Sequence, residues 1–84
     1  MSDVVNRMSN FLKLVELAGK KKYGSVDWER FRRDGRDDNL ASVVRHVAAQ
    51  TNGKAVDEET GLPHGAHAAF RLLMQVLEDF GDTE

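Results

Sequence analysis

The sequence predicts an all-α protein, a small antiparallel bundle of three main helices plus a short helical turn. Apolar residues recur at spacings of three and four in three long segments, and glycines or a proline lie where these segments should start or stop. The 84 residues are enough for a single domain spanning 1–84. Because a domain of this size buries only about 60% of its unfolded surface, we expect a homo-oligomer.

The first helix is predicted from an apolar stripe near the N-terminus. Ser2 or Asp3 can cap its start, and Gly19 or Gly24 can end it. The lysines at 20–22 would then lie near the negative end of the helix dipole. The stripe consists of Val4, Val5, Met8, Phe11, Leu12, Val15 and Ala18.

A short helical turn is predicted after the first helix. Ser25 or Asp27 can cap this turn, and Gly35 can end it. Trp28 and Phe31 are three residues apart, so they would lie on the same side of the turn.

The second long helix should begin at one of the polar residues 37–39 and end at Gly53. Several of its apolar residues are β-branched valines, which also suit strands. They do not alternate with polar residues, however, so the spacing favours a helix. Its apolar stripe consists of Leu40, Val43, Val44, Val47 and Ala48.

The last helix is expected to start with Pro63. Proline suits the first helical position, where its missing N–H group would have no partner in any case. A wide apolar face follows, and we expect this face to be buried. It consists of Ala66, Ala69, Phe70, Leu73, Met74, Leu77 and Phe80.

Charge is distributed unevenly along the chain. Residues 20–36 carry seven basic and three acidic side chains, although the whole chain has a net charge of −2. This basic segment either marks where a phosphate-bearing ligand approaches, or it caps helix ends and solvates a connection. The acidic total and the absence of a recognition motif disfavour nucleic-acid binding.

The composition also bears on stability and location. The chain has no cysteine, so a disulfide framework and a thiolate zinc site are both excluded. The N-terminus lacks the pattern of a signal peptide, and no apolar run approaches the ~20 residues that span a bilayer. We therefore expect a cytoplasmic protein that does not enter a membrane.

Polar side chains that can contact phosphates are expected where the helices pack. His64, His67 and Arg71 are three and four residues apart, so they would share one face of the last helix. Arg45 and His46 lie beside the valine stripe of the second long helix. Imidazoles and cations could therefore converge near the start of the last helix.

Carboxylates are available near the same position. Glu16 lies beside the first apolar stripe, and Asp57, Glu58 and Glu59 form an acidic loop before the last helix. Carboxylate oxygens from facing elements suit Mg²⁺, which keeps several water ligands. A zinc site is less strongly indicated, because neither an HExxH motif nor a Cys/His signature accompanies the histidines.

Several of these residues also have a structural explanation. His46 is either a packed histidine bonded to a backbone carbonyl or a catalytic base. His64 and His67 either bond to the acidic loop at the helix start or contact a ligand. Trp28 either anchors the core or an interface, or it stacks on a nucleobase. The same alternatives apply to Tyr23.

Short motifs along the chain occur in an order that resembles a known family. The stretch AGKKKYGSVDWERF is followed by an RH pair within a helix, by DEETGL and by HGAHA. Over residues 11–80 this order is similar to that of small phage-associated dATP/dGTP diphosphohydrolases, relatives of the MazG-like all-α nucleotide pyrophosphohydrolases. The matching residues are Lys21, Lys22, Tyr23, Gly24, Trp28, Arg45, His46, Asp57, Glu59, Thr60, Gly61, Leu62, His64, His67 and Ala68.

The resemblance implies a phage-derived protein that hydrolyses or binds purine (d)NTPs with Mg²⁺, in the host cytoplasm. The implied metal ligands are Glu16, Asp57 and Glu59. The implied catalytic residues are His46 and His67, and the implied substrate contacts are Lys21, Lys22, Tyr23, Trp28, Arg45, His64 and Arg71.

Two other hypotheses remain open at this stage. The chain could be a non-catalytic phage protein, a helical oligomer that sequesters a nucleotide or blocks a host protein. This hypothesis accounts for the small size of the chain and for the absence of the E-x-x-E and E-x-x-D carboxylates of typical MazG-like enzymes. The sequence also departs from the family pattern at Arg71, where the pattern has asparagine. A third hypothesis is a purely structural module whose apolar faces mediate dimerisation.

Overall fold

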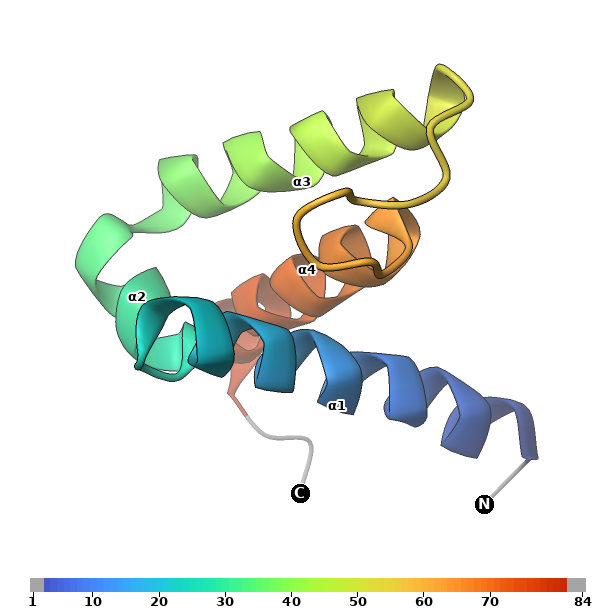
Figure 1. The fold of residues 1–84 in the computed structure, drawn as a ribbon. Helices are drawn as coiled ribbons and strands as arrows, with labels where there is room; N and C mark the ends of the chain where they lie inside the picture. Colours follow the sequence, from blue (N-terminus) through green and yellow to red (C-terminus); the bar gives the residue numbers. More distant parts are fainter. Residues whose placement is uncertain (1–2, 82–84) are drawn as a thin grey trace.

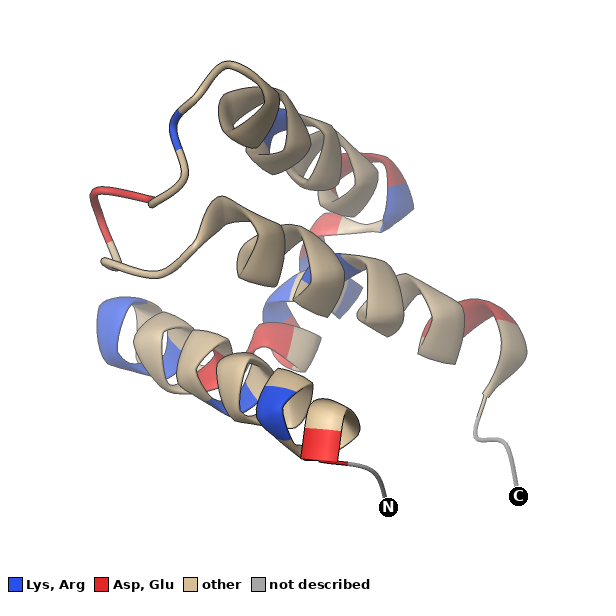
Figure 2. Ribbon diagram, turned by 90° about the vertical axis from the view of Figure 1, so that its right-hand side faces the viewer, with Lys and Arg blue, Asp and Glu red and all other residues tan. Residues whose placement is uncertain are grey.

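The computed structural model describes residues 3–81, and these form four helices and no strand (Figure 1). The predicted all-α fold, with three main helices and one short helix, is confirmed. Helix α4 lies between α3 and α1 (Figure 2), and it packs against both of them. The bounds of the helices are α1 (Asp3–Tyr23), α2 (Asp27–Asp34), α3 (Arg36–Thr51) and α4 (His64–Phe80).

The first two helices end at glycines. Helix α1 continues through Gly19 and ends before Gly24, whose N–H donates to the carbonyl of Lys20 at 2.8 Å. Gly24 has a φ of +71°, a conformation that suits glycine and stops the helix. Helix α2 ends before Gly35, which has a φ of +90°. Ser2, a predicted cap of α1, lies outside the described residues.

The predicted starts of α3 and α4 are wrong by at least one residue, and the predicted capping of α2 is wrong. Helix α2 has Val26 at its N-cap, and neither Ser25 nor Asp27 caps it through a side chain, because the Asp27 carboxylate pairs with Arg30 instead. Helix α3 begins at 36, directly after the glycine that ends α2. Helix α4 begins at 64, because Pro63 is extended (ψ 138°) and forms an isolated antiparallel bridge.

The connection between α3 and α4 folds back over the start of α4. Within it, Asp57 N–H donates to the carbonyl of Leu62, and His64 N–H donates to the carbonyl of Ala55, at 2.8 and 2.9 Å. Helices α3 and α4 run antiparallel on either side of this connection (Figure 1). The acidic loop is therefore held close to the first turn of α4.

The apolar core is small, and much of the predicted buried face is exposed. Within residues 3–81 the buried apolar side chains are those of Val15, Phe31, Ala68 and Met74. Phe80 is 81% exposed and Leu73 is 49% exposed, so the wide face of α4 is only partly covered. Helix α1 contacts α4 but leaves much of the apolar surface of α4 exposed.

Helix α3 turns a polar face toward α4, which corrects the predicted valine stripe. Val44 and Val47 are exposed, whereas Asn39 and Ser42 are buried. Asn39 donates to the backbone carbonyl of Arg71 at 2.9 Å, so an amide rather than a valine joins the two helices. No helix among the described residues is long and apolar enough to cross a bilayer.

Candidate functional site

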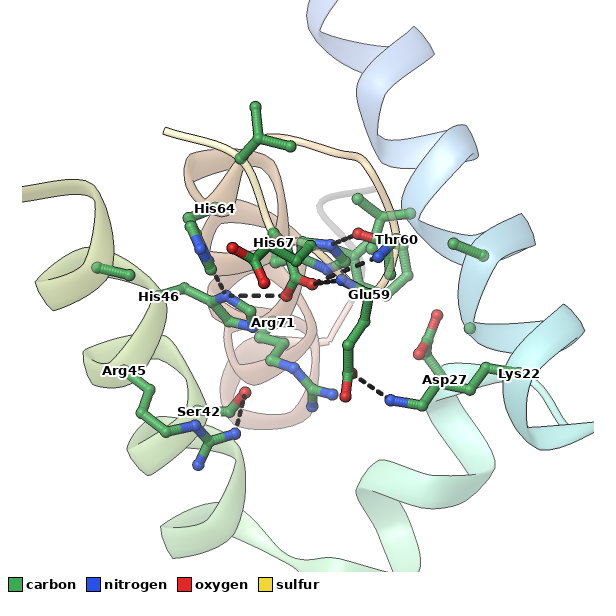
Figure 3. Close-up of a pocket in the computed structure, with 18 of the residues that line it drawn as sticks. Lys22, Asp27, Ser42, Arg45, His46, Glu59, Thr60, His64, His67 and Arg71 are labelled. Carbon is green, nitrogen blue, oxygen red and sulfur yellow. Dashed lines mark hydrogen bonds and ion pairs between the residues drawn. The ribbon is translucent and has the colours of Figure 1, made fainter. Parts of the chain in front are cut away.

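A polar pocket of about 720 Å³ lies between the C-terminal end of α1, the start of α2, helix α3, the acidic loop and the N-terminal half of α4 (Figure 3). Its size falls within the range of small-molecule sites, about 300–1,000 Å³. Five cationic and four acidic side chains line it. The cations are Lys22, Arg30, Arg45, Lys54 and Arg71, and the carboxylates are Asp27, Asp57, Glu58 and Glu59.

Three histidines form a cluster on one wall of the polar pocket. His46 comes from α3, and its Nδ1 lies 2.8 Å from Nδ1 of His64 on α4. The ring of His46 stacks on that of His67, with centroids 4.8 Å apart and an interplanar angle of 14°. His67 Nε2 is 2.7 Å from Oγ1 of Thr60, and this hydrogen bond helps to orient the ring.

Burial favours the uncharged form of two histidines in this cluster, His46 and His67. Burial, with the neighbouring His67 and His64, lowers the pKa of His46 to about 4. Burial also lowers the pKa of His67, although Asp57 opposes this effect. At neutral pH, His46 is therefore a neutral imidazole that can accept a proton or bind a metal ion.

The carboxylate of Asp57 is oriented by the turn that follows it. Its Oδ1 accepts the backbone N–H groups of Glu59 and Thr60 at 2.8 and 3.4 Å. Its Oδ2 faces His46 Nδ1 at 4.0 Å. Burial would raise the pKa of Asp57, but the Glu59 N–H bond and the nearby His67 outweigh it and hold the pKa below its usual value.

The cations of the polar pocket differ in how tightly they are paired. Lys22 forms an ion pair with Glu59 from the acidic loop, which bridges α1 to that loop. Arg45 donates to the hydroxyl of Ser42 at 3.4 Å, and no carboxylate among the described residues forms an ion pair with it. Arg71 extends into the pocket from α4 (Figure 3). Phosphate oxygens in the pocket would meet the guanidinium groups of Arg45 and Arg71, which come from two helices. Each guanidinium group can bind two such oxygens through parallel N–H donors.

An ion pair that the sequence reasoning missed forms part of the pocket wall. Asp27 and Arg30, on the first turn of α2, are both buried and paired with each other. Asp27 Oδ2 is buried and has no hydrogen-bond partner within residues 3–81. The Arg30 guanidinium also lies over the ring of Tyr23, 4.3 Å from its centroid. The available signal was the i, i+3 spacing of opposite charges, which is common on exposed helices and does not reveal burial.

The structure brings nine of the twelve predicted site residues to this pocket. These nine are Lys22, Tyr23, Arg45, His46, Asp57, Glu59, His64, His67 and Arg71. The three that do not line it are Glu16, Lys21 and Trp28. Glu16 and Lys21 are exposed on α1, and Trp28 stacks on Phe31 with ring centroids 5.3 Å apart.

The carboxylates predicted to hold Mg²⁺ are not gathered into one cage. Glu16 lies outside the pocket, Glu59 pairs with Lys22, and one oxygen of Asp57 is taken by backbone N–H groups. Among residues 3–81, the group of donors close enough for one metal ion is His46, Asp57 and His64, whose donor atoms lie within 4.8 Å of one another. This set mixes nitrogen and oxygen, which differs from the all-oxygen surroundings that Mg²⁺ prefers.

The fold and the pocket define a class of protein: a small all-α protein with a polar pocket that collects histidines, arginines and carboxylates from several helices. A family model described as "dATP/dGTP diphosphohydrolase, N-terminal" matches residues 2–82, almost the whole chain. The chain therefore belongs to this family, as its motifs predicted.

A curated relative agrees with this assignment. The dATP/dGTP diphosphohydrolase of Salmonella phage PMBT28 is 38% identical to this chain over 55 residues. The matched segment covers 66% of this chain but 18% of the relative, so the chain spans less than a fifth of that protein. No solved structure matches the chain significantly.

Proposed function

We propose that this chain forms the nucleotide site of a phage diphosphohydrolase that converts purine deoxynucleoside triphosphates, bound as their Mg²⁺ complexes, into monophosphates and pyrophosphate. The observation that carries the proposal is the polar pocket, in which cations from several elements surround the neutral imidazoles of His46 and His67. The family, and the printed name of the phage relative, support the choice of substrate.

The proposed reaction needs a nucleophile, a place for negative charge and a proton acceptor. Water attacks the α-phosphorus, the bond to the α–β bridging oxygen breaks, and pyrophosphate leaves. Arg45 and Arg71 bind the phosphate oxygens, while Mg²⁺ carried by the substrate offsets part of their charge. His46 or His67, neutral in this pocket, accepts the proton of the attacking water. Tyr23, at the rim, stacks on the base.

The test is incubation of the purified protein with each deoxynucleoside triphosphate and Mg²⁺, followed by separation of the products. We expect monophosphate and pyrophosphate from the purine substrates. Arg71→Ala should lower the rate at least about tenfold, because a phosphate contact worth about 1.4 kcal/mol or more is lost. The matched control is Arg33→Ala, since Arg33 is exposed on α2 and pairs with Asp34. Absence of product from the wild type would end the enzyme proposal, and equal product formation by wild type and Arg71→Ala would contradict the role given to Arg71.

A second candidate function is nucleotide binding without turnover. The observation in its favour is the dispersed carboxylate set, because Glu16, Asp57 and Glu59 do not form one metal cage. Calorimetry with dATP and dGTP distinguishes the two functions. Saturable binding in the absence of Mg²⁺, with intact nucleotide still recovered after Mg²⁺ is added, would support sequestration rather than hydrolysis.

We also propose that two copies of the chain associate. An apolar groove of about 470 Å³ runs between α1 and α4. Residues lining the apolar groove include Met8, Phe11, Leu12, Pro63, Ala66 and Leu73. Fifteen large apolar side chains are exposed within residues 3–81, whereas four apolar side chains are buried, so one copy covers little of its own apolar surface. A second copy can cover both grooves at once through a two-fold interface, and a host protein is the competing occupant.

A further inference from the structure

Three donor atoms meet on one wall of the polar pocket, although their residues are far apart in the chain. His46 Nδ1 on α3 lies 2.8 Å from His64 Nδ1 on α4 and 4.0 Å from Asp57 Oδ2 in the acidic loop. All three donors lie within 4.8 Å of one another. Two ligands bound at about 2.1 Å to one ion are at most about 4.2 Å apart, so small side-chain rotations would bring the three donors into range.

The surroundings of these donors hold them in place. The Oδ1 atom of Asp57 accepts two backbone N–H groups, which leaves Oδ2 directed toward the histidines. His46 is stacked on His67, and His67 is bonded to Thr60. Ordered outer partners of this kind orient the ligands of protein metal sites and raise affinity. The side chains of His46 and Asp57 are 14% and 16% exposed, so the donors are shielded and yet reachable from the pocket.

We propose that His46, Asp57 and His64 bind a divalent first-row transition-metal ion of the Zn²⁺ or Co²⁺ type. Two imidazoles and one carboxylate are a donor set for such ions, whereas Mg²⁺ favours oxygen ligands alone. In the metal-free protein, the short contact between the two Nδ1 atoms requires that one ring carries its proton on Nδ1. On binding, that proton moves to Nε2, and the metal ion takes its place between the rings.

The metal ion would have open coordination positions, because the protein supplies three ligands. The same three residues line the polar pocket, so water or an oxyanion in the pocket can fill these positions. With His46 bound to the metal ion, His67 remains the free imidazole of the cluster. The proposal stands on the geometry of the donors and does not depend on the proposed hydrolysis.

The experiment is a titration of untagged, chelator-treated protein with Co²⁺, without nucleotide, followed by its visible ligand-field absorption and by calorimetry. We expect saturable binding of one Co²⁺ per chain, displaced by Zn²⁺ but not by an excess of Mg²⁺. His64→Gln should weaken binding by at least about tenfold, since one of three ligands is lost. Glu58→Gln is the matched control, because Glu58 lines the same pocket but is not among the three donors, and it should bind as wild type does.

A second measurement uses only wild-type protein and so does not depend on how a variant folds. During a Zn²⁺ titration, imidazole ¹⁵N signals should show Nδ1 coordination for His46 and His64 and none for His67. Absence of saturable Co²⁺ binding, displacement by equimolar Mg²⁺, or coordination by His67 in place of His64 would each overturn the proposal. A protein that binds Co²⁺ but hydrolyses no nucleotide would retain this site and lose only the proposed function.

Discussion

At the scale of single residues, the buried pair of Asp27 and Arg30 shows how the pocket wall depends on charge compensation. Burial raises the pKa of Asp27, and the positive charges of Arg30 and Arg71 oppose this effect. Arg30 is also bonded to the carbonyl of Ser25. Both charges are therefore removed from water, and each depends on the other for compensation.

Replacing Asp27 with alanine should lower the free energy of unfolding by about 3–5 kcal/mol, because Arg30 would stay buried without its counter-charge. Asp34→Ala is the matched control. It removes a carboxylate paired with Arg33 at the surface, where the side chains are 71% and 41% exposed, so it should destabilise the fold far less than Asp27→Ala does. Urea unfolding of both variants measures the difference, and similar losses in the two would contradict the burial argument.

His46 predicts how the stability of the metal-free protein depends on pH. Its pKa is about 4 in the folded chain and has an ordinary value of 6.5 in the unfolded chain. Between these values the unfolded chain binds a proton that the folded chain does not, so the free energy of unfolding falls as the pH is lowered from 6.5 toward 4. The total loss is at most about 3–4 kcal/mol, at about 1.36 kcal/mol for each pKa unit.

Urea unfolding in the presence of a chelator, at about pH 7.5 and about pH 5, checks this dependence. The His46→Gln variant should lose less stability than wild type on acidification, because it lacks this group. His67 remains in both proteins and shifts both in the same direction. An equal loss in the variant and wild type would show that His46 does not carry the pH dependence.

The individual site residues were predictable, but their pairing was not. Sequence spacing joined His64 to His67, three residues apart on one helix, whereas the short contact joins His64 to His46 on another helix. That contact depends on how α3 packs against α4, which residue spacing does not specify. Glu16 was predicted to reach the site because it lies next to the apolar stripe of the first helix. It directly follows the buried Val15, however, and successive residues of a helix point about 100° apart. Its side chain is consequently exposed.

At the scale of helices, Gly19 lets α1 approach the first turn of α2. A Cβ atom added at Gly19 would lie 2.7 Å from both Arg30 Nη2 and Asp27 Oδ1. These two groups are buried and held by each other, so they cannot move aside without breaking the pair. Gly19 is therefore needed for close packing, although glycine is unfavourable inside a helix.

Gly19→Ala should lower the free energy of unfolding by about 1–3 kcal/mol, against the roughly 1 kcal/mol that helix propensity alone would add. Gly65→Ala in α4 is the matched control. A Cβ atom there would meet Oε1 of Gln50 at 2.6 Å, but this is the far end of an exposed side chain that can rotate away. Its stability should therefore change by less than about 1 kcal/mol, and a stabilised Gly19→Ala protein would refute the packing argument.

The existence of each helix was predictable, whereas the buried face of α3 was not. Apolar spacing located the helix correctly, and glycines marked where α1 and α2 end. Hydrophobic pattern alone assigned the valine side to the core, yet Asn39 and Ser42 are buried instead. The side-chain N–H group of Asn39 is satisfied across the interface with α4 by the carbonyl of Arg71, whereas Asn39 Oδ1 has no hydrogen-bond partner among the described residues. Such partners are visible only once the helices are placed together.

At the scale of the whole molecule, the polar pocket and the apolar groove lie on different sides of α4. The polar pocket uses its N-terminal turns together with α3 and the acidic loop, and the apolar groove uses the side that faces α1. Pro63 and Ala66 line the groove, while His64 and His67 line the polar pocket. Covering the groove would therefore brace the helix that carries two of the three histidines.

The proposed association of two copies predicts a change in mass when the groove is made polar. Phe11 lines the groove and is 46% exposed, so Phe11→Glu would place a charge where the second copy packs. Light scattering after gel filtration should give a dimer for wild type and a monomer for Phe11→Glu, because an unpaired charge would have to be buried in an apolar interface. Val44→Glu is the matched control, since Val44 is 67% exposed on α3 and lies outside the groove.

The masses of wild type, Phe11→Glu and Val44→Glu show whether the apolar groove, another apolar patch or no self-association accounts for the exposed apolar surface. If wild type and Val44→Glu are dimers and Phe11→Glu is a monomer, the groove is the interface between copies. A monomeric wild type would instead leave the groove to a different protein and contradict self-association. Dimers in all three proteins would place the interface on another exposed apolar patch, such as the one around Phe80, which is 81% exposed at the opposite end of α4. In that case the exposed surface would still be covered, but not beside the helix start that carries the histidines.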